Sequence, residues 1–176
     1  MVFKRILVGV IAALVCVGCN YQLYPPTVVV KPTFGQYRYA YIVPTGTVTA
    51  GVSGIAGFNG YVWGDGYSTS VSPSEVIAGD LMQRGYAILP EINDNFVDKT
   101  LIVSFGELGT RSVGLEAYTK EIIIQFRDAR TGDLVCSGQA EGLVDTFWHS
   151  YTETDATKYA IKTALDSIFE MLENSR

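Results

Sequence analysis

The chain has 176 residues, of which 13 are basic and 18 acidic, and its formal net charge is −5. A negative surface repels phosphate backbones, so we exclude nucleic acid as a partner. With one histidine and three cysteines, the chain lacks the closely spaced soft ligands of a zinc centre, and we predict no metal site.

The first 18 residues show the three zones of a signal peptide in the expected order. Lys4 and Arg5 form a positive region, and the 13 uncharged residues 6–18 match a signal-peptide core. That run is shorter than the about 20 residues of a membrane-spanning helix. The core ends at Gly18 and Cys19, which resemble the lipobox of bacterial lipoproteins. The resemblance implies cleavage between these two residues and acylation of Cys19 with fatty chains such as palmitate, so the membrane is a predicted partner.

Cleavage at this point leaves 158 of the 176 residues and 11 of the 13 basic side chains, with a net charge near −7. Such a length suits one domain with a real hydrophobic core. In bacterial lipoproteins an Asp after the acylated cysteine retains the protein in the inner membrane. Asn20 therefore favours the outer membrane of a Gram-negative bacterium. The alternatives are an ordinary secretory peptide cut elsewhere and an uncleaved anchor.

Cysteine usage excludes an intramolecular disulfide in the mature chain. Cys16, which stands where a lipobox usually has leucine, is removed, and Cys19 is acylated. Only Cys136 remains, in a strand-like run. We predict that it is a buried, small apolar residue, and the alternative is pairing with another molecule.

Residues 19–36 contain three prolines and are predicted to be an extended tether between the lipid and the domain. Docking of Tyr21 and Tyr24 onto the domain is an open alternative. The single domain is then expected over residues 37–174.

A first strand at residues 37–43 precedes a glycine-rich insert at residues 46–70. Seven glycines and one charge lie between Gly46 and Gly66, without the lysine of a Walker motif, so we expect no nucleotide or other cofactor. The insert either lies on the domain as an extended hairpin or forms an adhesive loop that contacts a partner. In the second case the contacting residues are aromatic: Phe58, Tyr61, Trp63 and Tyr67.

A helix is predicted to begin after Ser72, with Pro73 at its first position and Glu75 completing a capping box. Gly85 ends it. A second helix is expected over residues 154–172, capped by Thr152 or Thr154.

The remaining elements are strands with short connections between them. Residues 91–99 and 106–120 are predicted as connections, and residues 128–133 as a hairpin turn. Strands are predicted at 86–89, 100–105, 121–127 and 134–141. The fold class is therefore α+β, an antiparallel-rich sheet of about four to five strands with two helices packed on one face.

Three runs in this order carry a family resemblance: Ser72 to Leu89, Leu101 to Phe105, and Asp128 to Val135. They resemble small bacterial envelope lipoproteins with the TolB N-terminal-like fold. That group includes the flagellar accessory lipoprotein FlgO, penicillin-binding-protein activator lipoproteins and the periplasmic part of the curli secretion lipoprotein. The resemblance covers about residues 37–172, and the glycine-rich insert departs from these relatives.

No catalytic residue is predicted. The single histidine, His149, lies in an aromatic run without a Gly-x-Ser-x-Gly elbow, and we interpret it as a surface or interface residue. The alternative is a hydrolase that acts on envelope glycan through carboxylates such as Glu107 and Glu116. The favoured hypothesis is a non-enzymatic binding or assembly module. It would engage an unknown envelope protein or a copy of itself through a sheet edge or the glycine/aromatic loop.

Overall fold

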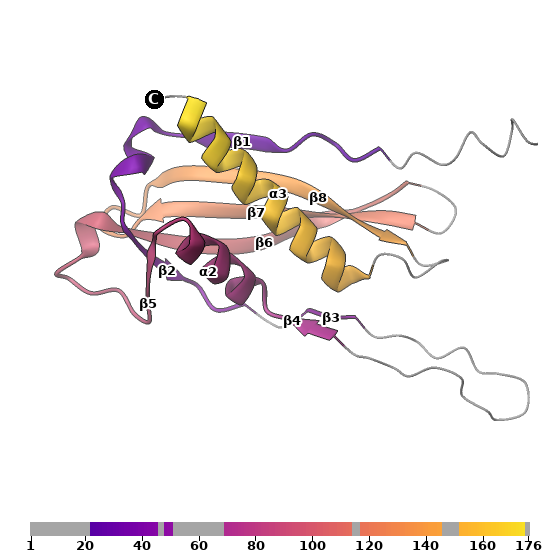
Figure 1. The fold of residues 1–176 in the computed structure, drawn as a ribbon, viewed down its shortest axis with the longest axis horizontal. Helices are drawn as coiled ribbons and strands as arrows, with labels where there is room; N and C mark the ends of the chain where they lie inside the picture. Colours follow the sequence, from indigo (N-terminus) through magenta and orange to yellow (C-terminus); the bar gives the residue numbers. More distant parts are fainter. Residues whose placement is uncertain (1–21, 46–47, 51–68, 114–116, 146–151, 175–176) are drawn as a thin grey trace, which may run out of the picture.

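A computed structural model describes residues 22–45, 48–50, 69–113, 117–145 and 152–174 (Figure 1). Several predicted features lie outside these residues and are not addressed by the fold: Gly18, Cys19, Phe58, Tyr61, Trp63, Tyr67, Glu116 and His149. Within the described residues, no helix has the length and apolar character needed to cross a bilayer.

The described part of the chain forms a six-stranded mixed sheet with strand order β1-β8-β7-β6-β2-β5, and a separate two-stranded sheet. The strands of the large sheet are β1 (Thr27–Val30), β2 (Tyr39–Ile42), β5 (Ala87–Leu89), β6 (Thr100–Ser112), β7 (Ala117–Asp128) and β8 (Leu134–Asp145). The pairs from β1 to β6 are antiparallel, whereas β2 runs parallel to both β6 and β5. The small sheet pairs β3 (Val48–Ala50) with β4 (Thr69–Val71).

Two α-helices are present in the described residues, α2 (Pro73–Gln83) and α3 (Glu153–Asn174), together with the 3-10 helices η1 (Pro32–Gln36) and η2 (Val97–Lys99). Both α-helices cover the same face of the large sheet (Figure 1). The α+β class with two helices on one face is confirmed. The predicted number of about four to five strands is too low, because the sheet has six. Three of its five pairings are antiparallel and two are parallel, so the sheet is mixed.

The core lies between that sheet face and the helices. In β7, Ile122, Ile124 and Phe126 are fully buried, whereas the residues between them are partly exposed. Since side chains alternate across a strand, the even-numbered residues face the helices and the odd-numbered ones face the open side. Helix α3 contributes a buried stripe at helical spacing: Ala160, Ile161, Ala164, Leu165 and Ile168.

The predicted ends of α2 are correct in position. Gly85 has a φ of +88°, its N–H donates to the Met82 carbonyl at 3.0 Å, and the Tyr86 N–H donates to the Leu81 carbonyl at 3.0 Å. These bonds define a Schellman motif. The predicted capping box is wrong, however. Ser72 makes no side-chain cap bond, because its hydroxyl pairs with that of Ser74 at 2.7 Å.

The start of α3 is capped by Thr152, one of the two predicted residues. The Asp155 N–H donates to Thr152 Oγ1 at 3.2 Å, and the Thr152 N–H donates to Asp155 Oδ2 at 3.3 Å. This reciprocal pair satisfies two N–H groups at the helix start that have no intrahelical partner. The other candidate, Thr154, is buried.

The N-terminal segment is part of the domain, in contrast to the tether predicted over residues 19–36. Residues Thr27–Val30 pair with β8, and η1 places Phe34 in the core with 0% exposure. The Phe34 ring packs against those of Phe126 and Phe169 in T-shaped arrangements, at centroid distances of 5.2 and 5.9 Å. The prolines flank this strand instead of extending through it. The tether prediction is therefore wrong from residue 27 onward.

The predicted loop at residues 106–120 is also wrong, since β6 and β7 continue through most of it. The register of this pair shifts at a bulge between Glu107 and Gly109, and Gly109 has a φ of +153°. Glycine at such a position lets a strand bend without ending. The hairpin turn at residues 128–133 is confirmed, with Gly132 at a φ of +75°.

Candidate functional site

The candidate site lies where the N-terminal segment meets the ends of the three longest strands. Arg111 stands near the end of β6, Thr119 near the start of β7 and Glu141 near the end of β8. The register pairs Arg111 with Thr119, on the sheet face that the helices do not cover. Tyr24 packs onto them from the N-terminal segment. We call Tyr24, Arg111, Thr119 and Glu141 the N-terminal clamp.

The Glu141 carboxylate is the centre of the clamp, and the residue is only 5% exposed. One oxygen accepts hydrogen bonds from Arg111 Nε and the Thr119 hydroxyl, both at 3.2 Å. The other accepts from Arg111 Nη2 at 2.7 Å and from the backbone N–H of Tyr24 at 2.9 Å. A buried carboxylate is tolerated because both oxygens are paired in this way.

These contacts keep the clamp charged. Burial by itself would raise the pKa of Glu141, but the hydrogen bonds from Arg111, the Tyr24 amide and Thr119 outweigh it and lower that pKa below its usual value. In turn, the hydrogen bond to Glu141 raises the pKa of Arg111 above its usual value. The pair therefore stays ionised at neutral pH.

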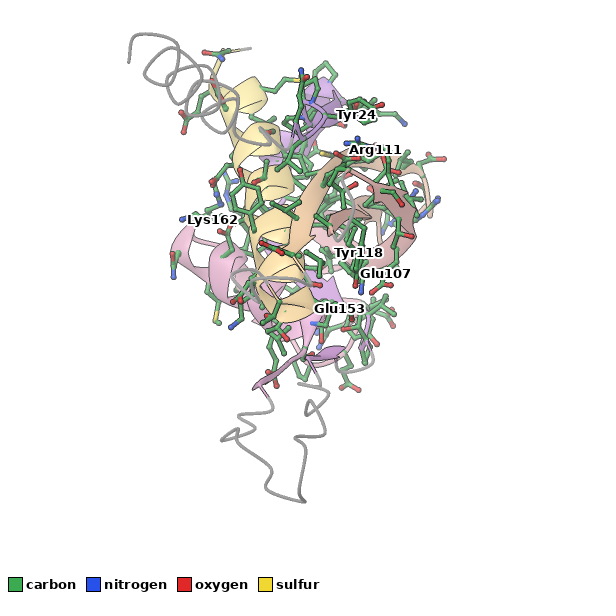
Figure 2. The ribbon with its side chains drawn as sticks, turned by 90° about the vertical axis from the view of Figure 1, so that its right-hand side faces the viewer. Tyr24, Glu107, Arg111, Tyr118, Glu153 and Lys162 are labelled. Atoms are coloured by element: carbon green, nitrogen blue, oxygen red, sulfur yellow. The ribbon has the colours of Figure 1, made fainter. Side chains whose placement is uncertain are left out.

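Arg111 also holds the segment that precedes Tyr24. Its guanidinium carbon lies 4.0 Å from the centre of the Tyr24 ring, and its Nη2 donates to the carbonyl of Gln22 at 3.2 Å. Figure 2 shows Tyr24 and Arg111 next to one another. The open alternative that Tyr24 docks on the domain is thus confirmed, whereas Tyr21 lies outside the described residues.

Two grooves flank the clamped segment. One, of about 280 Å³, is lined by Tyr24, Pro25, Thr27, Glu121, Gln139, Ala140 and Glu141. A more apolar one of about 410 Å³ is lined by Leu23, Leu143, Asp155, Ala156 and Tyr159. Neither lining set contains a histidine or a cysteine, and the first contains two carboxylates, those of Glu121 and Glu141.

A second polar cluster lies on the helix-covered side of the same strand ends. Lys120, which is 8% exposed, pairs with Glu107 Oε1 at 2.8 Å. The Tyr118 hydroxyl donates to Glu153 at 2.7 Å, and burial together with this bond raises the pKa of Tyr118 to about 12. Of the two carboxylates suggested for glycan hydrolysis, Glu107 is engaged in an ion pair with Lys120. The other, Glu116, lies outside the described residues. The glycan hydrolase stays a prediction.

Cys136 is buried in β8 with 1% exposure, as predicted. Burial raises the pKa of its thiol to about 12 from an ordinary 9.0. The described residues contain no group of three or more side chains arranged to hold a metal ion.

We expect Cys136 to react with a thiol reagent at pH 8 about 1,000-fold more slowly in the folded protein than in urea, since the thiolate fraction falls with the raised pKa. Kinetics of labelling with an aromatic disulfide would measure this. A folded-state rate within ten-fold of the unfolded one would contradict the burial of the thiol.

The strand β1 forms one edge of the large sheet and begins directly after the clamp. The Lys31 N–H donates to the Val135 carbonyl at 2.9 Å, so alternate residues, Val28 and Val30, direct their peptide groups away from β8. Val29 is 57% exposed. A groove of about 290 Å³ follows this edge and is lined by Pro26, Val28, Ser167, Glu170, Met171 and Asn174.

Of the clamp residues, only Tyr24 is singled out by the sequence, as a side chain that could dock on the domain. Arg111 fell in a segment predicted as a loop, and Glu141 at the predicted end of a strand. A charged residue in an otherwise apolar, strand-like run is the one signal that points to Glu141, since a buried carboxylate needs a partner. The identity of that partner depends on strand register.

The fold and the clamp together define a small α+β domain with its N-terminal segment fastened to the end of a mixed sheet. No family model matches the sequence, and no curated protein matches it. Among solved structures, two PelC dodecamers from Paraburkholderia phytofirmans are similar, one of them a point variant. The variant is 13% identical with a TM-score of 0.46, covering 80% of this chain and 92% of its own. The other is 12% identical with a TM-score of 0.45, covering 81% and 96%. At this distance the similarity assigns neither a family nor a function.

Proposed function

We propose that the chain is a lipid-anchored protein of the cell envelope that acts as a non-enzymatic binding or assembly module. Cys19 carries the anchor, and the β1 edge of the sheet is the contact surface. The observation that carries the proposal is the exposed edge of β1, which starts immediately after a segment fixed by a buried, fully paired carboxylate.

An unpaired edge strand offers backbone N–H and C=O groups that a second strand can bind. Here the outward peptide groups belong to Val28 and Val30, and the exposed Val29 side chain gives an added strand an apolar contact. The groove between β1 and α3 can receive side chains of that strand. The partner is an envelope protein or a second copy of this chain, and the glycine/aromatic insert is the other candidate contact.

Val29→Lys is expected to weaken partner or self association by about ten-fold or more, because a charge on the edge opposes strand addition. Val29 is largely exposed, so the fold is expected to persist. The measurement is affinity capture of the acylated protein from detergent-solubilised membranes, followed by identification of the captured chains.

Met82→Lys is the matched control, since Met82 is 56% exposed but lies on α2, away from the edge. Its captured chains should equal those of the unaltered protein. A protein lacking residues 46–66 tests the insert in the same way. If Val29→Lys captures everything that Met82→Lys does, the edge is not the contact surface.

Cys19→Ser is expected to move the protein from the membrane fraction to the soluble fraction. Each buried methylene contributes about 0.8 kcal/mol to membrane binding, so two or more long chains make the anchor effectively permanent. Cell fractionation and mass spectrometry of the native amino terminus measure this. An unmodified terminus, or unchanged fractionation of the variant, would refute the anchor.

A further inference from the structure

We infer that the N-terminal clamp holds one particular end of the sheet against the phospholipid headgroups, so that the domain stands upright on the bilayer and does not move freely on a tether. The inference rests on the proposed acylation of Cys19. Its partner is the headgroup surface of the membrane itself, and its site is the end of the domain that carries Arg111, Ser112 and Thr152.

The reach of the chain supports this orientation. Gln22 and Tyr24 are fixed to the sheet by Arg111 and Glu141. Only three peptide units separate Gln22 from Cys19, which limits the distance between them to about 11 Å. A free tether over residues 19–36 would instead reach about 60 Å. The clamp therefore removes most of the freedom that the sequence alone predicts.

The arrangement of the elements identifies which end is held. The clamped segment leaves the domain at the end where β6 and β8 finish and α3 begins (Figure 1). The opposite end carries the turn between β7 and β8, with Arg130 exposed. Strand β7 has 12 residues, so the two ends are about 40 Å apart.

The charges at the held end are mixed and do not supply the attraction to the membrane. Arg111 pairs with Glu141 and Lys120 with Glu107, whereas Glu153 and Asp155 at the start of α3 are anions that bond to the neutral Tyr118 and Thr152. The lipid chains therefore supply the attraction, and zwitterionic headgroups, which carry no net charge, suit this end better than anionic ones.

The orientation also gives the β1 edge a definite direction. If the strand ends face the bilayer, the strands rise from its surface and β1 lies along one side of the domain. Neighbouring anchored molecules then present their edges to each other in the plane of the membrane. The clamp thus places the proposed contact surface where lateral partners are found.

The test measures the distance of each end from the lipid headgroups. Ser112→Cys and Arg130→Cys each introduce one surface thiol, and a fluorophore on it reports the held and the opposite end. Cys136 is buried and Cys19 is acylated, so the new thiol is labelled alone. The full acylated protein is placed in phosphatidylethanolamine vesicles that contain a lipid with a nitroxide on its headgroup, a short-range quencher.

We expect quenching at position 112 to exceed that at position 130 by about five-fold or more, because the two sites differ by about 30 Å along the strands. Two variants should reduce the difference to less than two-fold. Tyr24→Pro removes both the N–H bonded to Glu141 and the ring that lies over Arg111, but leaves the ion pair between Arg111 and Glu141 intact. A ten-residue Gly/Ser insertion between Asn20 and Tyr21 lengthens the tether outside the described residues.

Circular dichroism checks that each variant is folded. If Tyr24→Pro does not fold, the insertion variant alone tests the orientation. Equal quenching at both positions in the unaltered protein would overturn the orientation while the anchor stands. A difference in quenching between the two positions that persists in the insertion variant would also overturn it. Release of the protein from vesicles by an alkaline wash would instead refute the acylation, and with it the proposed function.

Discussion

Gly142→Ala is expected to lower the free energy of unfolding by about 3 kcal/mol or more, at the upper end of overpacking effects. A Cβ at Gly142 would lie 2.0 Å from the carbonyl oxygen of Ala156 and 2.5 Å from its carbonyl carbon. Both are backbone atoms of α3, so no side-chain rotation relieves the clash. Either the first turn of α3 moves away from β8 or the strand bends.

Gly79→Ala is a control that makes the same substitution but is expected to raise the free energy of unfolding. Nothing lies within 4 Å of a Cβ at Gly79, which is in the middle of α2. Alanine there should stabilise the protein by about 0.5–1 kcal/mol, since glycine is the poorer helix former. Urea unfolding followed by circular dichroism measures the free energy of unfolding of both variants. Equal midpoints for the two variants would show that α3 does not pack directly on β8.

The elements that the sequence predicted well are those with a local signal. Helix α2 ends at Gly85 because a Schellman motif needs a positive φ there, and that requirement is visible in three or four residues. The buried strands around Leu101 and Ile122 show the expected enrichment in branched side chains. The turn at residues 128–133 follows from its glycine.

The features that the sequence did not predict depend on distant pairing. Strand β1 has four residues between prolines, which is too short for a periodic signal, and its partner Cys136 is more than a hundred positions away. The clamp requires the register of three strands, since Arg111 and Glu141 meet only after β6, β7 and β8 are aligned. The bulge at Gly109 also hides the continuation of β6, because its glycines suggest a loop.

The capping box at Ser72 failed for a different reason. The pattern of residues was correct and the helix begins where it predicts, but a neighbouring hydroxyl, that of Ser74, competes for the Ser72 side chain. Local hydrogen bonds between short polar side chains are close in energy to a cap. The sequence pattern therefore predicts the position of the helix start more reliably than the bond that caps it.

Phe34→Ala is expected to cost about 3–5 kcal/mol of stability, although Phe34 lies in the segment that the sequence predicts to be a tether. Its ring is fully buried between Phe126 on β7 and Phe169 on α3. A residue in a solvated tether would contribute nothing measurable. Thermal and urea unfolding of the non-acylated chain from Asn20 onward give the value.

Two comparisons make the result specific to burial in this segment. Val29→Ala lies in the same segment but changes a largely exposed side chain, so it should cost less than about 1 kcal/mol. A chain that begins at Tyr37 lacks both β1 and Phe34 and is expected not to fold, because β8 loses one of its two neighbouring strands and the core loses a fully buried aromatic ring. If that chain folds with the stability of the longer one, the N-terminal segment is a tether after all, and the short reach of the lipid anchor no longer follows.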